Sequence, residues 1–158
     1  MVAVDGSVRW FDGFKKGGFA SVWGDKSHIL NRQKISNLEP LSYIQELEGI
    51  LLAIQTAVSH NIDFILILVD NKASLETAKL IISEPRREDY LVLSNNNVDI
   101  AKFLNKIGNL SKDKNIKLLH LHSHTGIPGV FTRMNSLADS VANEILDVTY
   151  EFKQSIQV

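Results

Sequence analysis

The chain has 158 residues, of which 44% are hydrophobic, so it can bury the core of one compact domain covering residues 1–158. It has no cysteine, which excludes disulfides, thiolate metal ligands and a cysteine nucleophile, and favours a reducing, cytoplasmic location. The net charge is −1 and no segment is predicted to span a membrane, so we expect a soluble monomer that binds nucleic acid only through local basic patches.

The first third of the chain is predicted to form an antiparallel meander followed by a helix. β-Branched and aromatic residues favour strands at 1–7, 17–23 and 28–35, with a glycine-containing loop running past Phe14 between the first two. Helical periodicity then predicts a helix at 42–60. The apolar stripe of this helix consists of Leu47, Ile50, Leu51, Ile54 and Val58.

Two apolar runs in the second half of the chain predict strands that are buried on both faces. They are FILILVD at 64–70, which ends in Asp70, and IKLLHLHS at 116–123. Helical patterns at 72–83 and 98–108 lie between these two strands.

A last helix is predicted at 135–152, and the expected order βββαβααβα describes an α/β fold with a five-stranded mixed sheet flanked by helices. In open α/β sheets, ligands bind beyond the carboxyl ends of the parallel strands, where Asp70 and His124 fall. The inner side of the last helix consists of Leu137, Val141, Ala142, Ile145 and Val148. The expected loops are 84–89, 94–97 and 126–134.

Three acidic residues stand out, although each has an ordinary structural explanation. Asp5 could begin an Asp-Gly turn, Asp70 could cap the following helix, and the dipole of the last helix could favour Asp139. No one of them indicates a functional site by itself.

Glu46 is the fourth such residue. It shares a side of its helix with Ile50 and Ala53 and is predicted to face inward, whereas Glu48 shares a side with Gln55 and is predicted to be a solvated charge. Four carboxylates at one sheet edge would repel one another without a cation, and hard oxygen ligands suit Mg²⁺ or Mn²⁺. A metal site would therefore explain all four acids together.

Short motifs along nearly the whole chain resemble those of the type 1 ribonuclease H family. The set gains its specificity from the motif order and from the expected order of strands and helices. The motifs are VDGS at 4–7, GGFASVW at 17–23, QELEGILLAI at 45–54, LVDN at 68–71, HSHTGIPG at 122–129 and NSLADSVA at 135–142.

The sequence departs from the family pattern in two places. Ser136 replaces the glutamate of the family's Asn-Glu-x-x-Asp helix, and the loop after the histidine turn carries the additional residues VFTRM at 130–134. The middle of the chain also lacks a strongly basic helix, so substrate affinity is expected to be weak or to be supplied by a protein partner.

The resemblance implies an endoribonuclease that hydrolyses the RNA strand of RNA–DNA hybrids with two Mg²⁺ ions, or with Mn²⁺, giving 5′-phosphate and 3′-hydroxyl ends. The implied catalytic residues are Asp5, Glu46, Asp70, His124 and Asp139. Asp5 would bridge both ions, Glu46 and Asp70 would hold one of them, and Asp139 would help to hold the other. His124 would assist proton movement or product departure.

Substrate contacts are also implied by the resemblance. Glu46 and neighbouring backbone groups could contact the 2′-hydroxyl that distinguishes RNA from DNA. Lys15 and Lys16 are further candidates, with ordinary solvated lysines as the alternative. The implied substrate-binding residues are Gly6, Ser7, Asn71 and Lys72.

Two other functions stay open. Holliday-junction resolvases and integrase-type nucleases also gather carboxylates on this sheet, although the His124 turn and the Glu46 helix favour ribonuclease H. A non-catalytic module that binds nucleic acid or a protein is the third hypothesis, and the presence of all four acids argues against it.

The stretch LHLHSHTGIPG at 119–129 places His120, His122 and His124 at alternate positions, which could indicate a zinc-binding strand. No further clustered ligands accompany them. We therefore predict that His120 and His122 are packed or hydrogen-bonded strand residues and that only His124 belongs to the site.

Overall fold

The computed structural model describes residues 1–83, 97–121 and 129–156, with side chains described up to residue 148. Five strands form one mixed sheet, as predicted. The strands are β1 (Val2–Phe11), β2 (Phe14–Val22), β3 (Arg32–Ile35), β4 (Phe64–Val69) and β5 (Asn115–His120). Their order across the sheet is β3-β2-β1-β4-β5, in which β1 to β3 are antiparallel and both β4 and β5 run parallel to β1.

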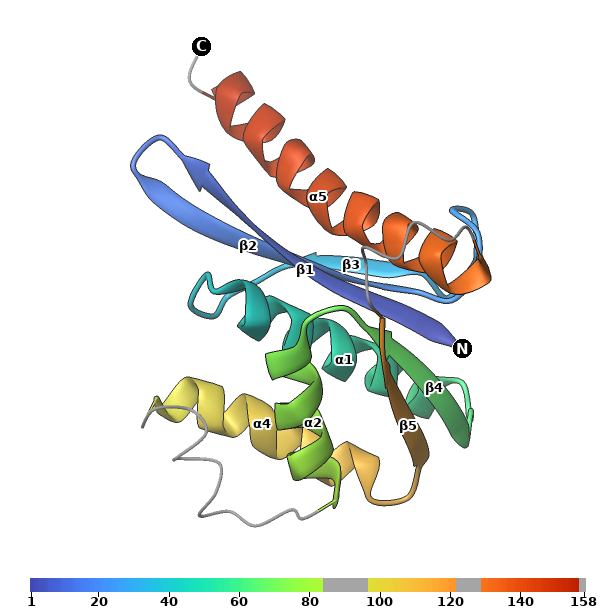
Figure 1. Ribbon diagram of the computed structural model, residues 1–158. Helices are drawn as coiled ribbons and strands as arrows, with labels where there is room; N and C mark the ends of the chain where they lie inside the picture. The colour runs from blue at the N-terminus through green and yellow to red at the C-terminus, as the bar shows by residue number, and fades with distance from the viewer. Residues whose placement is uncertain (84–96, 122–128, 157–158) are drawn as a thin grey trace.

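Helices cover both faces of the sheet (Figure 1). Those described are α1 (Ser42–Ser59), α2 (Lys72–Ser83), α4 (Val98–Ser111) and α5 (Val130–Ile156). α5 lies across one face, and α1 with α2 and α4 packs on the other. The expected α/β order βββαβααβα is therefore confirmed, and none of these described helices is long and apolar enough to cross a membrane.

Strand alternation divides the core into two layers. Val4 and Ile67 point to the α1 side, whereas Ala3 and Leu68, their direct neighbours, point to the α5 side. Since β1 and β4 are central and face helices on both sides, any polar residue at their ends is held between two packed layers.

The hairpin of β1 and β2 is longer than predicted. β1 continues to Phe11 and β2 begins at Phe14, so only Asp12 and Gly13 form the connection. Gly13 has a φ of +92°, which glycine adopts without steric cost in a tight two-residue turn.

Gly17 and Gly18 lie in β2, as the predicted strand at 17–23 requires. A Cβ at Gly17 would come within 2.5 Å of the side chain of Gln45 in α1, and one at Gly18 within 2.9 Å of Ile145 in α5. The glycines let helices approach the strand closely from both sides, so their lack of a side chain is a packing requirement.

β3 is shorter than the predicted strand at 28–35. In the loop before it, the N–H of His28 donates to the carbonyl of Asp25 at 3.0 Å, and the N–H of Trp23 donates to the side chain of Asn31 at 2.7 Å. These local hydrogen bonds satisfy backbone groups that a longer strand would have paired.

The second apolar run is not buried on both faces, contrary to the prediction. β5 is the edge strand, with Ile116 and Leu118 packed on the core and Leu119 40% exposed. α5 packs mainly on β1, β2 and β3 on the other face, so it does not bury Leu119 of the edge strand.

The predicted bounds of the first helix and of α2 are nearly correct, and α4 continues three residues past its predicted end at 108. Val58, which was expected in the apolar stripe of α1, is 38% exposed in the last turn of that helix.

α5 begins at Val130, so the residues VFTRM at 130–134 are its first turns and not part of a loop. The N–H of Arg133 donates to the carbonyl of Gly129 at 2.9 Å, and Met134 is buried. On the inner side, Leu146 is buried where Val148 was expected, and Val148 is exposed.

Candidate active site

Asp5 lies where β1 passes the end of β4. The two strands pair in parallel at Val2 with Ile67 and at Ala3 with Leu68. Continuing this register places Asp5 beside Asp70, the residue that follows the last residue of β4. Asp5 is buried and Asp70 is half-buried, so the carboxyl end of β4 carries two adjacent acids, one of them nearly without solvent contact.

Glu46 of α1 is tied to the same strand end by backbone hydrogen bonds. Its Oε1 accepts from the N–H of Asp70 and from the N–H of Asn71, both at 2.9 Å. Gly6 allows α1 to approach β1 this closely, because a Cβ at residue 6 would lie 2.4 Å from the backbone nitrogen of Glu46. The prediction that Glu46 faces inward is therefore correct, and Gly6, predicted to bind substrate, is a packing contact between β1 and α1.

Asp139 approaches from α5 on the opposite face and is exposed. Asn143, one turn later, donates from Nδ2 to the Asp139 carbonyl at 3.0 Å and to its Oδ1 at 3.4 Å. The Ser7 hydroxyl donates to Asn143 Oδ1 at 2.7 Å, which links β1 to this pair. Sequence reasoning missed Asn143, although its spacing of four residues from Asp139 on one helix was a usable signal.

The carboxyl groups of Asp5, Glu46 and Asp139 interact directly. Burial, the charge of Glu46, and a hydrogen bond with Asp139 together raise the pKa of Asp5 to about 9. Burial also raises the pKa of Glu46, although the N–H groups of Asn71 and Asp70 oppose that increase. Carboxylates from β1, α1 and α5 are thus held close enough to disfavour one another's ionisation.

The donor chemistry of these acids fits a hard divalent cation, because all are carboxylate oxygens and a cation would offset their mutual repulsion. Within residues 1–83, 97–121 and 129–148, no three His, Cys, Asp or Glu side chains form a group that could hold a metal ion as they stand. A metal would therefore have to draw the side chains together.

The two remaining predicted substrate contacts, Asn71 and Lys72, begin α2. Asn71 Oδ1 accepts from the N–H of Ser74 at 3.0 Å and from its hydroxyl at 3.2 Å, so Asn71, and not Asp70, caps the helix. Lys72 is exposed and lies 4.0 Å from Glu76 one turn later. Asp70 is thus left without the capping function that was its ordinary explanation.

The histidine series is described only in part. The Nε2–H of His120 donates to the carbonyl of Asp70 at 2.8 Å, which confirms a hydrogen-bonded residue at the end of β5. His122 and His124, together with loop residues 84–89 and 94–96, lie outside the described residues.

Glu48 was predicted to be a solvated charge, and this is wrong. It is buried, accepts from the hydroxyl of Ser36 and from Nε2 of Gln45, and burial raises its pKa. The prediction from helical periodicity assumed that α1 is buried only on the side that faces the sheet. The segment after β3 also covers the side of the helix that carries Glu48.

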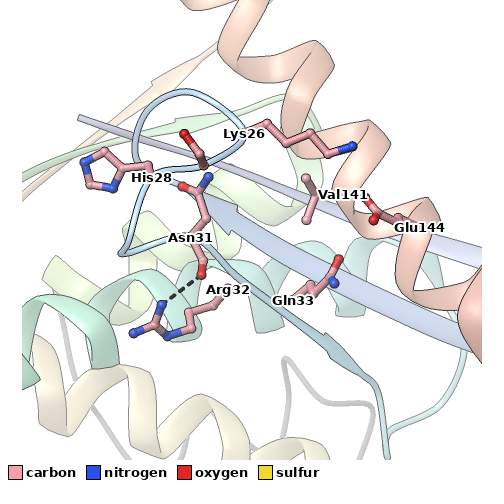
Figure 2. A pocket seen from close by; sticks show the side chains of 8 residues that line it. Lys26, His28, Asn31, Arg32, Gln33, Val141 and Glu144 are labelled. Atoms are coloured by element: carbon pink, nitrogen blue, oxygen red, sulfur yellow. Dashed lines mark hydrogen bonds between the residues drawn. The ribbon is translucent and has the colours of Figure 1, made fainter.

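A hollow of about 240 Å³ lies apart from the carboxylates, between the loop before β3 and α5 (Figure 2). Lys26 extends toward α5, whereas His28 and Arg32 point away from it, and Arg32 donates to the carbonyl of Asn31 at 2.9 Å. Its lining includes Glu144 of α5 but none of the four predicted acids, so it is not part of the carboxylate site.

This sheet order, with acids at the carboxyl end of β4 and on the two flanking helices, defines a ribonuclease H-like fold. Solved structures agree. The prototype foamy virus protease-reverse transcriptase matches with a TM-score of 0.69 and 18% identity, over 90% of this chain and 20% of that one. The solution structure of the PFV ribonuclease H domain matches with a TM-score of 0.67 and 16% identity, over 90% of this chain and 91% of that domain.

Ribonuclease H1 from the halophilic archaeon Halobacterium salinarum also matches, with a TM-score of 0.57 and 18% identity, over 92% of this chain and 96% of that one. No protein-family model matches the chain, and no curated protein matches it. At these identities the likeness establishes the fold, and the activity has to be argued from the residues.

Proposed function

We propose that the protein is a metal-dependent nuclease that hydrolyses the RNA strand of RNA–DNA hybrids. The observation that carries the proposal is the convergence of Asp5, Glu46 and Asp139, from β1, α1 and α5, beside Asp70 at the carboxyl end of β4. Such crowding of carboxylates is unfavourable for the protein alone, because the negative charges repel one another. A bound cation would offset this repulsion, so the cluster is typical of a functional site that binds cations.

Asp5, Glu46, Asp70 and Asp139 would hold the metal, with Asp5 in contact with both Glu46 and Asp139. Bound Mg²⁺ or Mn²⁺, as two ions, would activate the attacking water and stabilise the leaving oxygen. Glu46 is oriented by two backbone N–H groups, and Asn143 orients Asp139. His124, which lies outside the described residues, would assist proton movement.

The test is cleavage of a hybrid labelled on its RNA strand, in the presence of Mg²⁺, with duplex RNA, duplex DNA and a four-way junction as alternative substrates. We expect cleavage of the hybrid alone, with 5′-phosphate and 3′-hydroxyl products. Cleavage of the junction or of duplex DNA in its place would assign the protein to the resolvase and integrase type. Hybrid binding without cleavage, by protein that is folded and loaded with Mg²⁺ or Mn²⁺, would indicate a non-catalytic module.

Matched variants separate the site from its surroundings. Glu46→Gln should abolish cleavage, whereas Glu48→Gln changes an equally buried glutamate on the same helix that lies outside the carboxylate cluster and should retain it. Metal binding has its own measurement, because Mg²⁺ should raise the melting temperature of the wild type and not that of Asp5→Asn. Equal loss of cleavage in both glutamate variants would contradict the proposed site.

A further inference from the structure

The hairpin of β1 and β2 extends beyond the carboxylates as a two-stranded arm, here the hairpin arm, residues 8–17. β4 pairs with β1 only at Val2 and Ala3, whereas β2 pairs with β1 up to Phe11. Figure 1 shows the arm reaching past α1, with α5 running along its other face. Gly17 at the base of the arm packs against Gln45 of α1, and farther out the α1 side of the arm carries an exposed aromatic residue.

Trp10 lies on the α1 side of the arm. Alternation along β1 places Gly6, Val8 and Trp10 on one face, and Gly6 contacts α1 at Glu46. At about 3.3 Å per residue, Trp10 lies about 13 Å farther along the strand than Gly6. Trp10 is 68% exposed, so a large aromatic side chain stands in solvent on the face of β1 that packs against α1, the helix that carries Glu46.

Lys15 lies directly across the hairpin from Trp10 and covers part of its ring. The two residues are paired in the ladder, and Lys15 Nζ is 4.7 Å from the ring centroid. This cation–π contact restricts the indole and places a positive charge beside an aromatic surface.

The charge of the arm is opposite to that of the chain as a whole. Residues 9–16 include three basic side chains and one acidic side chain, in a protein whose net charge is −1. Arg9 is paired with Asp147 of α5, so the lysines provide the excess charge on the arm. Aromatic rings combined with lysines are the arrangement that binds single-stranded nucleic acid, whose unpaired bases stack and whose phosphates attract cations.

We propose that Trp10 and Lys15 form a platform for a single-stranded extension of the substrate: an unpaired base stacks on the indole while Lys15 contacts a neighbouring phosphate. A single strand is required because the bases of a duplex are already stacked on one another. The inference rests on the proposed function in taking the substrate to be nucleic acid, and it adds a preference for hybrids that carry a single-stranded overhang.

The test compares the affinity of the protein for an overhang hybrid with its affinity for a blunt hybrid, by fluorescence anisotropy in EDTA so that no cleavage occurs. We expect the wild type to bind the overhang hybrid about tenfold more tightly, within the range for one base–aromatic stack, and Trp10→Ala to reduce this ratio to about one. Phe64→Ala, which removes another exposed aromatic residue at the start of β4, should keep the ratio.

Two further measurements examine the same contact. The chain has two tryptophans, so Trp23→Phe leaves Trp10 as the sole tryptophan, and a single-stranded oligonucleotide should quench its fluorescence excited at about 295 nm, where tyrosine absorbs little. Lys15→Gln should reduce the slope of log affinity against log salt by about 0.7, the loss of one phosphate contact on a single strand.

The outcomes separate this inference from the proposed function. An overhang preference that is unchanged in Trp10→Ala would overturn the platform even if hybrids are cleaved. A Trp10-dependent preference without any cleavage would support the platform and count against the nuclease. A change in Trp10 fluorescence that follows protein concentration and not oligonucleotide concentration would assign the surface to self-association and overturn the proposal.

Discussion

The two helices that flank the carboxylate site hold their acids in different ways. α1 presents Glu46 as a buried side chain whose Oε1 accepts two backbone N–H groups at 2.9 Å. α5 presents Asp139 in solvent, with the Asn143 side chain 3.4 Å from its carboxylate. One half of the site is thus fixed by the backbone before any ligand binds, whereas the other half can adjust.

The contact between β1 and α1 is the most sensitive point of the fixed half. Gly6→Ala would place a Cβ 2.4 Å from the backbone nitrogen of Glu46, and neither main chain can move without disturbing the core. We expect the free energy of unfolding, measured by urea denaturation, to fall by about 4 kcal/mol or more, beyond ordinary overpacking because the clash is with backbone.

Gly129→Ala is the control for this substitution, because a Cβ there meets no atom of the described residues within 4 Å. It should change the free energy of unfolding by less than about 0.5 kcal/mol. If both substitutions lowered the free energy of unfolding equally, β1 and α1 would be able to move apart at Gly6, which contradicts a fixed contact between them.

The two acids should differ in what their neutral variants do to cleavage. We expect Glu46→Gln to reduce kcat by about a thousandfold, because the loss of charge falls on a preorganised group. Asp139→Asn should reduce it by about a hundredfold, because water and small movements of an exposed side chain can partly compensate. Single-turnover cleavage of a labelled hybrid measures both, with Asp147→Asn as an exposed control on α5; a greater loss in Asp139→Asn would reverse the comparison.

The pH dependence of stability tests the electrostatics of the centre. The pKa of Asp5 is about 9 in the folded state against an ordinary value of 3.8, so between these values the folded state binds the extra proton and unfolding becomes easier as pH rises. Asn cannot ionise, so the free energy of unfolding of Asp5→Asn, measured with urea, should exceed that of the wild type by on the order of 2 kcal/mol at pH 7. Near pH 3 the two proteins should be equally stable. An advantage that is the same at both pH values would contradict this.

The smallest effect is expected at Asn143. Asn143→Ala removes the hydrogen bonds to Ser7 and Asp139 but leaves the acids in place, so we expect a five- to tenfold loss of kcat and about 1 kcal/mol of stability. Asn143→Asp keeps the acceptor for Ser7 but adds a charge next to Asp139. Cleavage that is equal in both variants would indicate that the Asp139 contact is unimportant.

The sequence predicts the fold well because its strongest signals are periodic. The stripe of α1 and the apolar run of β4 can each be packed in essentially one way, and their bounds are nearly correct. Strand ends were less predictable: most of the predicted loop past Phe14 belongs to β1 and β2, because a two-residue turn at Asp12 and Gly13 lets both strands continue to pair.

At the site, the sequence predicts acids that the structure brings together, but not all of their hydrogen-bond partners. Periodicity correctly turns Glu46 inward, and it fails for Glu48, because the hydrogen bond from Ser36 comes from a segment whose position a helical pattern cannot show. Asn71 Oδ1 accepts from the N–H of Ser74 and caps α2, and the contact of Asn71 with substrate stays a prediction. The contact of Ser36 with Glu48 depends on the distance between two elements, which only the folded chain provides.

The two N–H groups that donate to Glu46 can also be observed by NMR spectroscopy. The amide protons of Asp70 and Asn71 point at a carboxylate whose charge should change when a cation or a proton arrives. Their NMR chemical shifts and exchange rates would therefore follow the electrostatic state of the site residue by residue. These two backbone amides at the end of β4 would therefore report metal binding or protonation at the site in the absence of substrate and turnover.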